Sequence, residues 1–416
     1  MADAGPRRVL AVADSDSYLK WAVTLVAGLG EGWEVQVLVL RTPITPSPEQ
    51  VRAAAGADLP VVRSRELLAR VRATRPDAVL LACTGPVISA LLEYPELRGP
   101  DRPVLVTGLP GISWPVRWKG IRFRSGTDLF VLHSERERRG YAAEAAYRGY
   151  QMDFVLATLP FLQERAHHAE GRDIVFAAQA KVPREVGERE AVLRALAAVE
   201  PPLRPVVKVR ALAHELQTHH EELPYATLWD ELSAREGLPH DRITFRAGSM
   251  AEALQDAAGF VTVSSTAALE AIHAGVPTIV LDDFGVSAEM INEVFRGSGL
   301  LHGLDDLRAG RFSPPDERWL AENYFHPPEA NTWVPRLTEL VDRRRARPLG
   351  PAQVTGLRRL RGRVWRQGRL LLPGWAWDAA NRLRRLRPRR SAPPTQDGTP
   401  APARTAPGPP PHPPAG

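Results

Sequence analysis

The chain has 416 residues, of which 44% are hydrophobic and 25% charged, and it contains a single cysteine, Cys83. This composition is typical of a soluble globular protein, and no apolar run approaches the roughly 20 residues that a membrane-spanning helix needs. One cysteine excludes an intrachain disulfide and a multi-cysteine metal site. The first residues lack the pattern of a signal peptide, so a cytoplasmic location is expected.

The formal net charge of +6 is concentrated near the C-terminus. Arg358 to Arg390 contains twelve arginines and one acid, which gives this segment +11 and leaves −5 on the rest of the chain. A mildly acidic body gives no reason to expect a nucleic-acid partner. Three tryptophans interleave with the arginines, so residues 346–390 are expected to bind an anionic membrane surface peripherally at its inner face. Residues 391–416 hold ten prolines and are expected to be disordered.

Strand-like and helical patterns alternate through residues 1–165. Short apolar runs predict strands at Val9–Ala13, Glu34–Leu40, Ala78–Ala82, Val104–Val106 and Leu129–Leu132. The helical patterns between them are Tyr18–Leu29, Ser64–Thr74 and Glu135–Arg148. This order is typical of a parallel sheet with helices on both faces, so a first Rossmann-like domain is expected here.

The alternation begins again in residues 171–345. Strands are predicted at Ile174–Ala177, Val206–Val209, Ile243–Phe245, Phe260–Val263 and Thr278–Leu281. Helices are predicted at Glu188–Ala198, Tyr225–Glu236, Ala251–Ala257 and Thr266–His273. A second Rossmann-like domain follows from this pattern. The helical stretch Arg318–Arg345, which prolines interrupt, could pack back across the first domain.

A hydroxyl-rich turn, Ser264-Ser265-Thr266, follows the fourth strand of the second domain. In an open parallel sheet such a turn opens on the ligand crevice. Hydroxyl and N–H groups at a helix N-terminus favour a phosphate there. Glu270 lies one helical turn below Thr266, where it can accept hydrogen bonds from a ribose. An ordinary serine N-cap with a solvated glutamate is the alternative.

Two further groups are expected at the same crevice. Gly248, Ser249 and Met250 precede a helix, and Gly248 would let the backbone come close to a ligand. Ser249 and Glu252 also have the spacing of a capping box, so plain helix capping is the alternative. Lys208 ends a strand and could hold a phosphate, although a lysine at a strand end is often only solvated.

The segment from Gly259 to Pro277 resembles the donor-binding half of nucleotide-sugar glycosyltransferases of the two-Rossmann, or GT-B, fold. The likeness lies in the Ser-Ser-Thr turn, the glutamate-bearing helix and the Ala-Gly-Val-Pro exit. Residues 13–22 (ADSDSYLKWA) and 108–115 (GLPGISWP) are similar to a glycosyltransferase family of GC-rich bacteria that is assigned from its fold. That similarity spans residues 7–340.

The resemblance implies an α/β, GT-B-like fold and a nucleotide sugar as donor substrate in the second domain. It places the acceptor and the catalytic base in the first domain, with no cofactor and no bound metal. His214, His219 and His220 lie in a polar loop without the spacing of a metal site. Asp14 and Asp16 form an Asp-x-Asp pair. The metal-binding pair of the other glycosyltransferase fold occupies a different position, so a metal site is not expected here either.

The first domain supplies the candidates for base and acceptor contacts. Asp16 is the first choice for a general base on an acceptor hydroxyl and Asp14 the second, with helix capping as the alternative. His133, at another strand end, is the remaining candidate. The residues expected near the acceptor follow strand ends or lie in a basic loop: Ser17, Lys20, Thr84, Gly85, Gly108, Pro110, Gly111 and Lys119.

These features predict a metal-independent, inverting glycosyltransferase. Its expected acceptor is a cell-envelope or capsule-type glycan, or a lipid-linked one. Two alternatives stay open: a nucleotide-sugar epimerase of the same fold, and a non-catalytic, membrane-associated binding protein.

Overall fold

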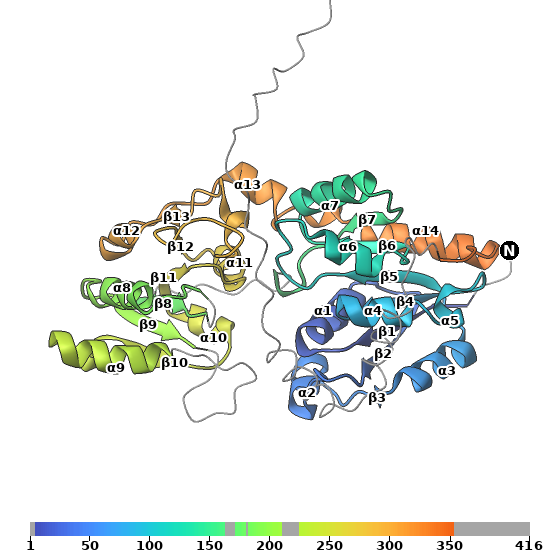
Figure 1. The fold of residues 1–416 in the computed structure, drawn as a ribbon, viewed down its shortest axis with the longest axis horizontal. Helices are drawn as coiled ribbons and strands as arrows, with labels where there is room; N and C mark the ends of the chain where they lie inside the picture. The colour runs from blue at the N-terminus through green and yellow to red at the C-terminus, as the bar shows by residue number, and fades with distance from the viewer. Residues whose placement is uncertain (1–4, 163–170, 180–181, 210–223, 353–416) are drawn as a thin grey trace, which may run out of the picture. The chain divides into compact units, whose positions relative to one another are not determined.

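Residues 5–162, 171–179, 182–209 and 224–352 are described in the computed structural model. Their strands form two parallel sheets (Figure 1), and both sheets belong to one compact unit, Met1–Leu372. The predicted pair of Rossmann-like sheets is therefore confirmed. The segment Arg358 to Arg390, the proline-rich tail and His214, His219 and His220 lie outside the described residues, so their predictions stay predictions.

The first sheet has the strand order β3-β2-β1-β4-β5-β6-β7. Its strands are β1 Arg7–Ala13, β2 Trp33–Leu40, β3 Val61–Val62, β4 Ala78–Ala82, β5 Val104–Gly108, β6 Leu129–Leu132 and β7 Asp153–Leu156. The helices that follow them are α1 Asp16–Ala27, α2 Pro48–Ala55, α3 Ser64–Thr74, α4 Gly85–Leu91, α5 Pro95–Arg98, α6 Trp118–Arg124 and α7 Glu135–Tyr147.

Alternation along β1 shows why this sheet needs helices on both faces. Val9, Ala11 and Ala13 belong to one hydrophobic core, which includes α1. Leu10 and Val12 belong to another, which includes α3 and α4. Successive side chains of a strand point to opposite faces, so a run that is apolar throughout must be covered twice.

The second sheet has the strand order β10-β9-β8-β11-β12-β13. Its strands are β8 Asp173–Ala177, β9 Arg204–Lys208, β10 Thr244–Arg246, β11 Ala257–Thr262, β12 Thr278–Leu281 and β13 Leu301–His302. Its helices are α8 Val186–Ala197, α9 Tyr225–Glu236, α10 Met250–Gln255, α11 Ala267–His273, α12 Leu304–Arg308 and α13 Glu317–Glu322.

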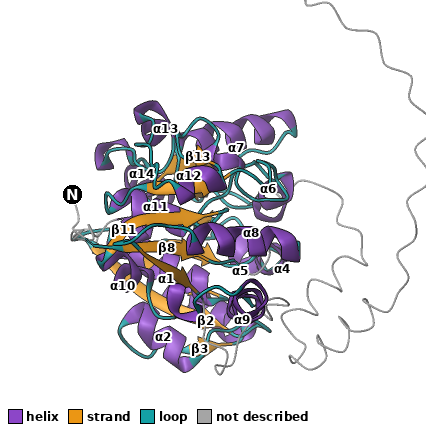
Figure 2. Cartoon of the chain, turned by 90° about the vertical axis from the view of Figure 1, so that its left-hand side faces the viewer, coloured by secondary structure: helices purple, strands orange, loops and turns teal. Residues whose placement is uncertain are grey.

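Helices cover both faces of this second sheet (Figure 2). Ile174 and Phe176 of β8 pack in a core that contains α8 and α9. Val175 and Ala177 of the same strand pack in a core that contains α10 and α11. The strands β3, β7 and β13 were not predicted from the sequence. β3 and β13 have only two residues each, which is too few to carry a pattern.

The last described helix, α14 Trp333–Ala346, returns to the first sheet (Figure 1). Trp333, Leu337, Leu340 and Val341 pack in the core of β1 and α1. The predicted range 171–345 therefore includes a helix whose apolar face is buried against the first sheet. Pro335 does not interrupt this helix as expected, because it lies in the first turn, where no N–H partner is required.

Among the described residues, no helix is long and apolar enough to cross a membrane.

Candidate functional site

Each sheet reverses its strand order beside its first strand. In the first sheet β1 lies between β2 and β4, and in the second β8 lies between β9 and β11. In open parallel sheets, ligands bind outside the carboxyl ends of the strands at this reversal. The residues that follow β1, β4, β8 and β11 are therefore the ones to examine.

The Gln179 side chain connects the two strand ends at the reversal of the second sheet. The Gln179 Oε1 atom, beyond β8, accepts hydrogen bonds from the Ser264 backbone N–H at 2.9 Å and from its hydroxyl at 2.9 Å. Because both groups need an acceptor, the amide oxygen faces Ser264. The Gln179 Nε2 group then points elsewhere, and it has no partner among the described residues. Sequence reasoning missed Gln179, although its place two residues beyond the first strand was a usable signal.

The Ser264-Ser265-Thr266 turn uses most of its own N–H groups. The Ser265 N–H donates to Thr262 Oγ1 at 3.1 Å, and the Ala267 N–H donates to Ser265 Oγ at 3.2 Å. These N–H groups are therefore not free to bind a phosphate, since a partly buried turn must satisfy its donors. Within the described part of the chain, the Thr266 N–H is left without a protein acceptor, and the Thr266 side chain is exposed.

Lys208 and Glu270 bring opposite charges to the same strand ends. Lys208 ends β9, directly opposite Ala177 of β8, and its Nζ donates to the Val209 carbonyl at 2.8 Å. Burial raises the pKa of Glu270, while the charge of Lys208 lowers it. The hydrogen bonds from Ser249 chiefly lower the pKa of Glu252, and Lys208 adds to that effect. Lys208 thus acts electrostatically on both glutamates.

The Gly248-Ser249-Met250 segment forms a helix cap. The Ser249 hydroxyl accepts from the Glu252 N–H at 3.2 Å, and Glu252 Oε2 accepts from the Ser249 N–H at 3.0 Å. Gly248 has a φ of 106°, and a Cβ there would lie 2.7 Å from Glu252 Oε2. The capping alternative is confirmed, with Met250 as the first helical residue. A ligand role for this segment stays a prediction.

The reversal of the first sheet repeats the double contact of the second. Asp14 Oδ2, beyond β1, accepts from the Thr84 N–H at 2.9 Å and from the Thr84 hydroxyl at 2.7 Å. Asp14 is fully buried, and burial raises the pKa of its carboxyl. Its other oxygen, Oδ1, has no partner among the residues that the structure describes. In this conformation Asp14 holds Thr84 and does not reach solvent.

Asp16 lies closer to the surface. It is the first residue of α1, and its Oδ2 pairs with Lys20 Nζ at 2.9 Å. Its Oδ1 has no partner in the described part of the protein. The Asp16 side chain is 31% exposed, and the neighbouring Ser17 and Lys20 are exposed as well. Of the two aspartates, Asp16 is therefore the one whose side chain reaches the surface, although its unpartnered Oδ1 is itself buried.

His133 is buried, and both of its ring nitrogens are engaged. It is fully buried, its Nε2 accepts from the Trp21 indole N–H at 2.7 Å, and its Nδ1 lies 2.9 Å from the Ala157 carbonyl. A carbonyl only accepts, so Nδ1 carries the proton and both ring nitrogens are engaged. Burial lowers the pKa of His133 to about 4. His133 thus faces the core in this structure, because a strand end can face the core as well as the ligand, and its catalytic role stays a prediction.

Close packing against aromatic rings explains why glycine occupies two positions that were predicted to lie near the acceptor. A Cβ on Gly108 would lie 2.5 Å from Trp21 Cζ2, and one on Gly85 would lie 2.7 Å from Phe123 Cδ2. Both glycines make room for an aromatic ring. Nothing in these contacts points to a ligand.

The loop that begins at Gly108 also reaches the Ser264-Ser265-Thr266 turn. Gly111 has a φ of 84°, and a Cβ built on it would lie 3.6 Å from Thr266 Cγ2. The Ser113 N–H, in the same loop, donates to the buried Glu137 Oε1 at 2.7 Å, and the Tyr324 hydroxyl also bonds to that oxygen. Pro110, in the same loop, is half-buried. The structure thus brings predicted first-domain residues beside predicted donor residues.

The predicted basic loop that contains Lys119 is helix α6 in the structure. Lys119 and Arg122 are on its surface. Arg124 is 2% exposed and donates to Tyr18 Oη at 2.7 Å and to the Cys83 carbonyl at 3.0 Å. Arg124 therefore supports the strand ends around Asp14.

The Gln179 contact leads to a stability prediction. Gln179→Ala removes the acceptor of two donors on Ser264, which is only 6% exposed. Unsatisfied buried donors should lower the free energy of unfolding by about 1–3 kcal/mol. Gln179→Glu, which keeps an acceptor oxygen, should stay close to the wild type. Urea denaturation measures the free energy of unfolding, with Gln255→Ala, a change at an exposed residue of α10, as the control. Equal stability of Gln179→Ala and the wild type would contradict the prediction.

Two Rossmann-like parallel sheets with polar contacts at both reversals define the GT-B class of fold. The family described as "Putative glycosyltransferase (DUF6716)" matches residues 9–340, and the chain belongs to it. The protein is thus a member of a glycosyltransferase family, as the resemblance implied. A comparison with curated proteins gave no match.

Solved structures share the fold at low sequence identity. A UDP-N-acetylglucosamine 2-epimerase is 14% identical with a TM-score of 0.53, and the match covers 85% of this chain and 100% of that one. S. aureus MnaA in complex with UDP is 12% identical with a TM-score of 0.51, covering 84% and 100%. At such identities the likeness concerns the fold alone.

Proposed function

We propose that the protein transfers a sugar from a nucleotide-activated donor to a hydroxyl of a cell-envelope or capsule-type glycan, or of a lipid-linked glycan. Membership of a glycosyltransferase family supports the reaction class. The arginines and tryptophans of Arg358 to Arg390 support peripheral binding at an anionic inner membrane surface, where a lipid-linked acceptor would be presented.

The observation that carries the proposal is the contact between Gln179 and Ser264 at the reversal of the second sheet. It fixes the Ser-Ser-Thr turn at the position where such sheets bind ligands. The Thr266 N–H and the Gln179 amide would donate to the donor phosphates. Lys208 supplies positive charge at the adjacent strand end, and the half-buried Glu270 would accept from the ribose hydroxyls.

For the chemical step we assign Asp16 as general base. The acceptor oxygen attacks the anomeric carbon and gives its proton to Asp16, while the bond to the phosphate oxygen breaks and the nucleoside diphosphate leaves with the electron pair. The configuration of the sugar inverts. Preorganised donors and the charge of Lys208 would stabilise the leaving phosphate, without a bound metal or cofactor.

Ligand-dependent thermal unfolding tests the donor site. A panel of nucleoside diphosphates and their sugar esters should raise the Tm of the wild type for at least one base. The same ligand should bind at least about tenfold more weakly to Ser265→Ala/Glu270→Ala, because the proposed Glu270 contact to the ribose is lost and the Ser265 hydroxyl no longer caps the Ala267 N–H in the turn that would hold the phosphates. Glu231→Ala, an exposed change on α9, should bind as the wild type does.

Two results would count against the proposal. No Tm shift with any nucleotide would remove the enzyme interpretation, and unchanged binding by the double variant would place the donor elsewhere. Incubation with the bound sugar nucleotide and no acceptor should leave its sugar unchanged. An epimerised sugar would instead support the epimerase alternative.

A further inference from the structure

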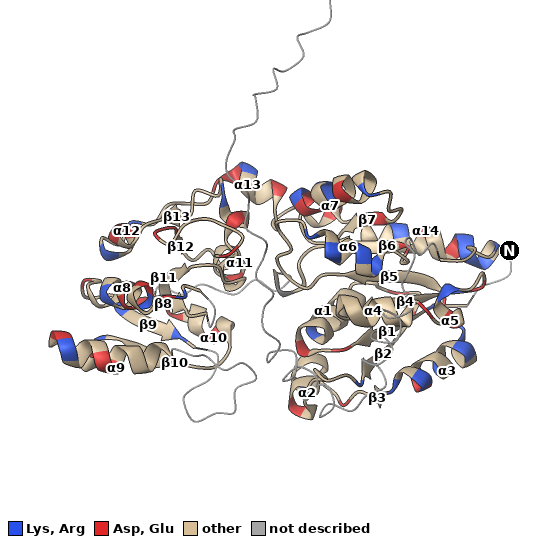
Figure 3. Ribbon diagram, in the orientation of Figure 1, with Lys and Arg blue, Asp and Glu red and all other residues tan. Residues whose placement is uncertain are grey.

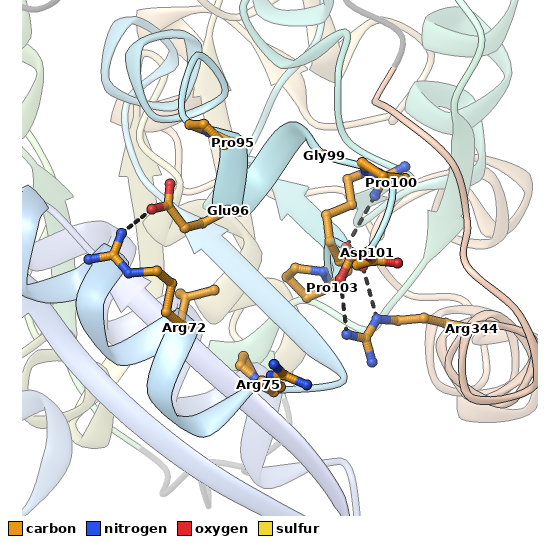
Figure 4. A pocket seen from close by; sticks show the side chains of 12 residues that line it. Arg72, Arg75, Pro95, Glu96, Gly99, Pro100, Asp101, Pro103 and Arg344 are labelled. Carbon is orange, nitrogen blue, oxygen red and sulfur yellow. Dashed lines mark hydrogen bonds and ion pairs between the residues drawn. The ribbon is translucent and has the colours of Figure 1, made fainter.

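A cavity of about 710 Å³ lies at the amino-terminal edge of the first sheet. Its walls come from the end of α3, from α5, from the turn before β5 and from α14 (Figure 4). Arg75 and Arg102 precede β4 and β5, whereas Asp14 and Thr84 lie beyond the carboxyl ends of their strands. The cavity is thus at the opposite edge of the sheet from the proposed acceptor region. We propose that it binds a small phosphorylated molecule that carries hydroxyl groups.

Arginine is the main charged residue of the cavity lining, although Asp128 and Asp77, which are outside the lining, pair with Arg102 and Arg344. Four arginines line it, Arg72, Arg75, Arg102 and Arg344, against two acids, Glu96 and Asp101. Figure 4 shows Arg72 and Glu96 on one side of the opening, Asp101 and Arg344 on the other, and Arg75 between the two sides. Basic segments on α3 and on the end of α14 are also visible in Figure 3. Such a lining favours an anion.

Three of the arginines are held in place by the protein. Arg72 pairs with Glu96. Arg102 is 7% exposed and makes two bonds to Asp128, at 2.6 and 2.8 Å. Arg344 donates to the Arg102 carbonyl at 2.9 Å. Held guanidinium groups lose little freedom when a ligand binds, which favours affinity.

Some donor and acceptor groups of the lining residues have no hydrogen-bond partner. The buried Arg102 Nε has no partner among the described residues, and the same holds for Glu96 Oε2. The Arg75 guanidinium makes no hydrogen bond or ion pair to any described residue. The unpaired Arg75 guanidinium suits a phosphate, and the buried groups of Arg102 and Glu96, which need a partner, suit further polar groups of the same molecule, among them a hydroxyl. A phosphorylated sugar or polyol combines these groups.

The backbone of Arg75 gives independent support. Arg75 ends α3 in the left-handed conformation, with φ 43° and ψ 61°. At the ends of α2 and α9 the same conformation is filled by glycine, Gly56 and Gly237. Glycine adopts it without steric cost, and an L-residue does not. An arginine at this position therefore opposes backbone preference, and the cavity offers its side chain a role.

Arg75→Gly separates binding from folding, because it relieves the backbone while removing the guanidinium. Calorimetry with inorganic phosphate and glycerol 3-phosphate, and sedimentation with phosphatidylglycerol vesicles in phosphatidylcholine, should use the full chain. Arg65→Gln, an exposed change on α3 outside the cavity, is the control. We expect Arg75→Gly to bind glycerol 3-phosphate at least about tenfold more weakly than the wild type and Arg65→Gln do, because a charge-assisted bond is lost. Its Tm should not fall below that of the wild type.

Excess nucleoside diphosphate should leave this binding unchanged, because the donor site is elsewhere; this outcome does not depend on the proposed enzymatic function. The segment Arg358 to Arg390 should give all three proteins the same background of vesicle binding. Binding above that background by the wild type and Arg65→Gln but not by Arg75→Gly, without binding of the two soluble phosphates, would identify the phosphate as a lipid headgroup. Equal binding by Arg75→Gly and wild type would overturn the inference. So would displacement by the nucleoside diphosphate, or no binding of any probe.

Discussion

Asp16→Asn should lower the rate of sugar transfer by roughly 10²–10⁴-fold, which is the usual contribution of a general base. Asparagine has nearly the same shape but cannot take the proton of the acceptor hydroxyl. Binding of the donor should change by less than about twofold, since the proposed donor contacts lie on the second sheet. The release of nucleoside diphosphate measures the rate, with the sugar nucleotide found by thermal unfolding and an envelope lipid extract as acceptor.

Two further aspartate-to-asparagine variants serve as controls for the Asp16→Asn measurement. Asp58→Asn changes an exposed first-domain aspartate that pairs with Arg52, and it should leave the rate unchanged. Asp14→Asn should act chiefly on stability, because Asp14 is buried and holds Thr84. A normal rate in Asp16→Asn would remove Asp16 from the catalytic role.

Between pH 7 and pH 5, the wild type should lose about 2 kcal/mol more unfolding free energy than His133→Gln, as follows from proton linkage. The pKa of His133 is about 4 in the folded protein, against about 6.5 in an unfolded chain. Below pH 6.5 the unfolded state binds more protons, so stability falls as the pH drops from 6.5 toward 4. Above this window the contribution of His133 is fully present.

Urea denaturation at several pH values measures the difference. Glutamine keeps an acceptor oxygen for the Trp21 indole and has no titration in this range, so the variant isolates the histidine. Burial raises the pKa values of Asp14 and Glu137, which act in the opposite direction. Both proteins contain these acids, so their effect cancels in the comparison. Parallel pH curves for the two proteins would show that His133 titrates normally.

The apolar periodicity of neighbouring residues was enough to predict the class of fold and the position of the Ser-Ser-Thr turn on the second sheet. The β4, β6 and β12 strands and the α3 and α9 helices have the predicted bounds, because each is a continuous run with clear apolar periodicity. The Ser-Ser-Thr turn lies where prediction placed it, between β11 and α11. The second sheet could be predicted from the restart of the alternation near Ile174.

Contacts between distant parts of the chain decided the rest of the site. Gln179 and Ser264 are 85 residues apart, and Asp14 and Thr84 are 70 apart. A strand end predicts a polar residue near the sheet edge, but not whether that residue meets a ligand or a neighbouring strand. His133 and Arg124 therefore turned out to be buried and partnered, and the arginine-lined cavity could not be predicted.

By itself, the sequence determined the alternation of strands and helices, the two sheets and the hydroxyl turn of the second one, because each depends on neighbouring residues and their periodicity. Only the tertiary structure decided which of the predicted polar groups remain available to a ligand. It placed α14 on the first sheet, left Asp16 accessible and buried Asp14 and His133. The physical reason is that a hydrogen-bond donor or acceptor is satisfied by groups that folding brings close, whatever their separation along the chain.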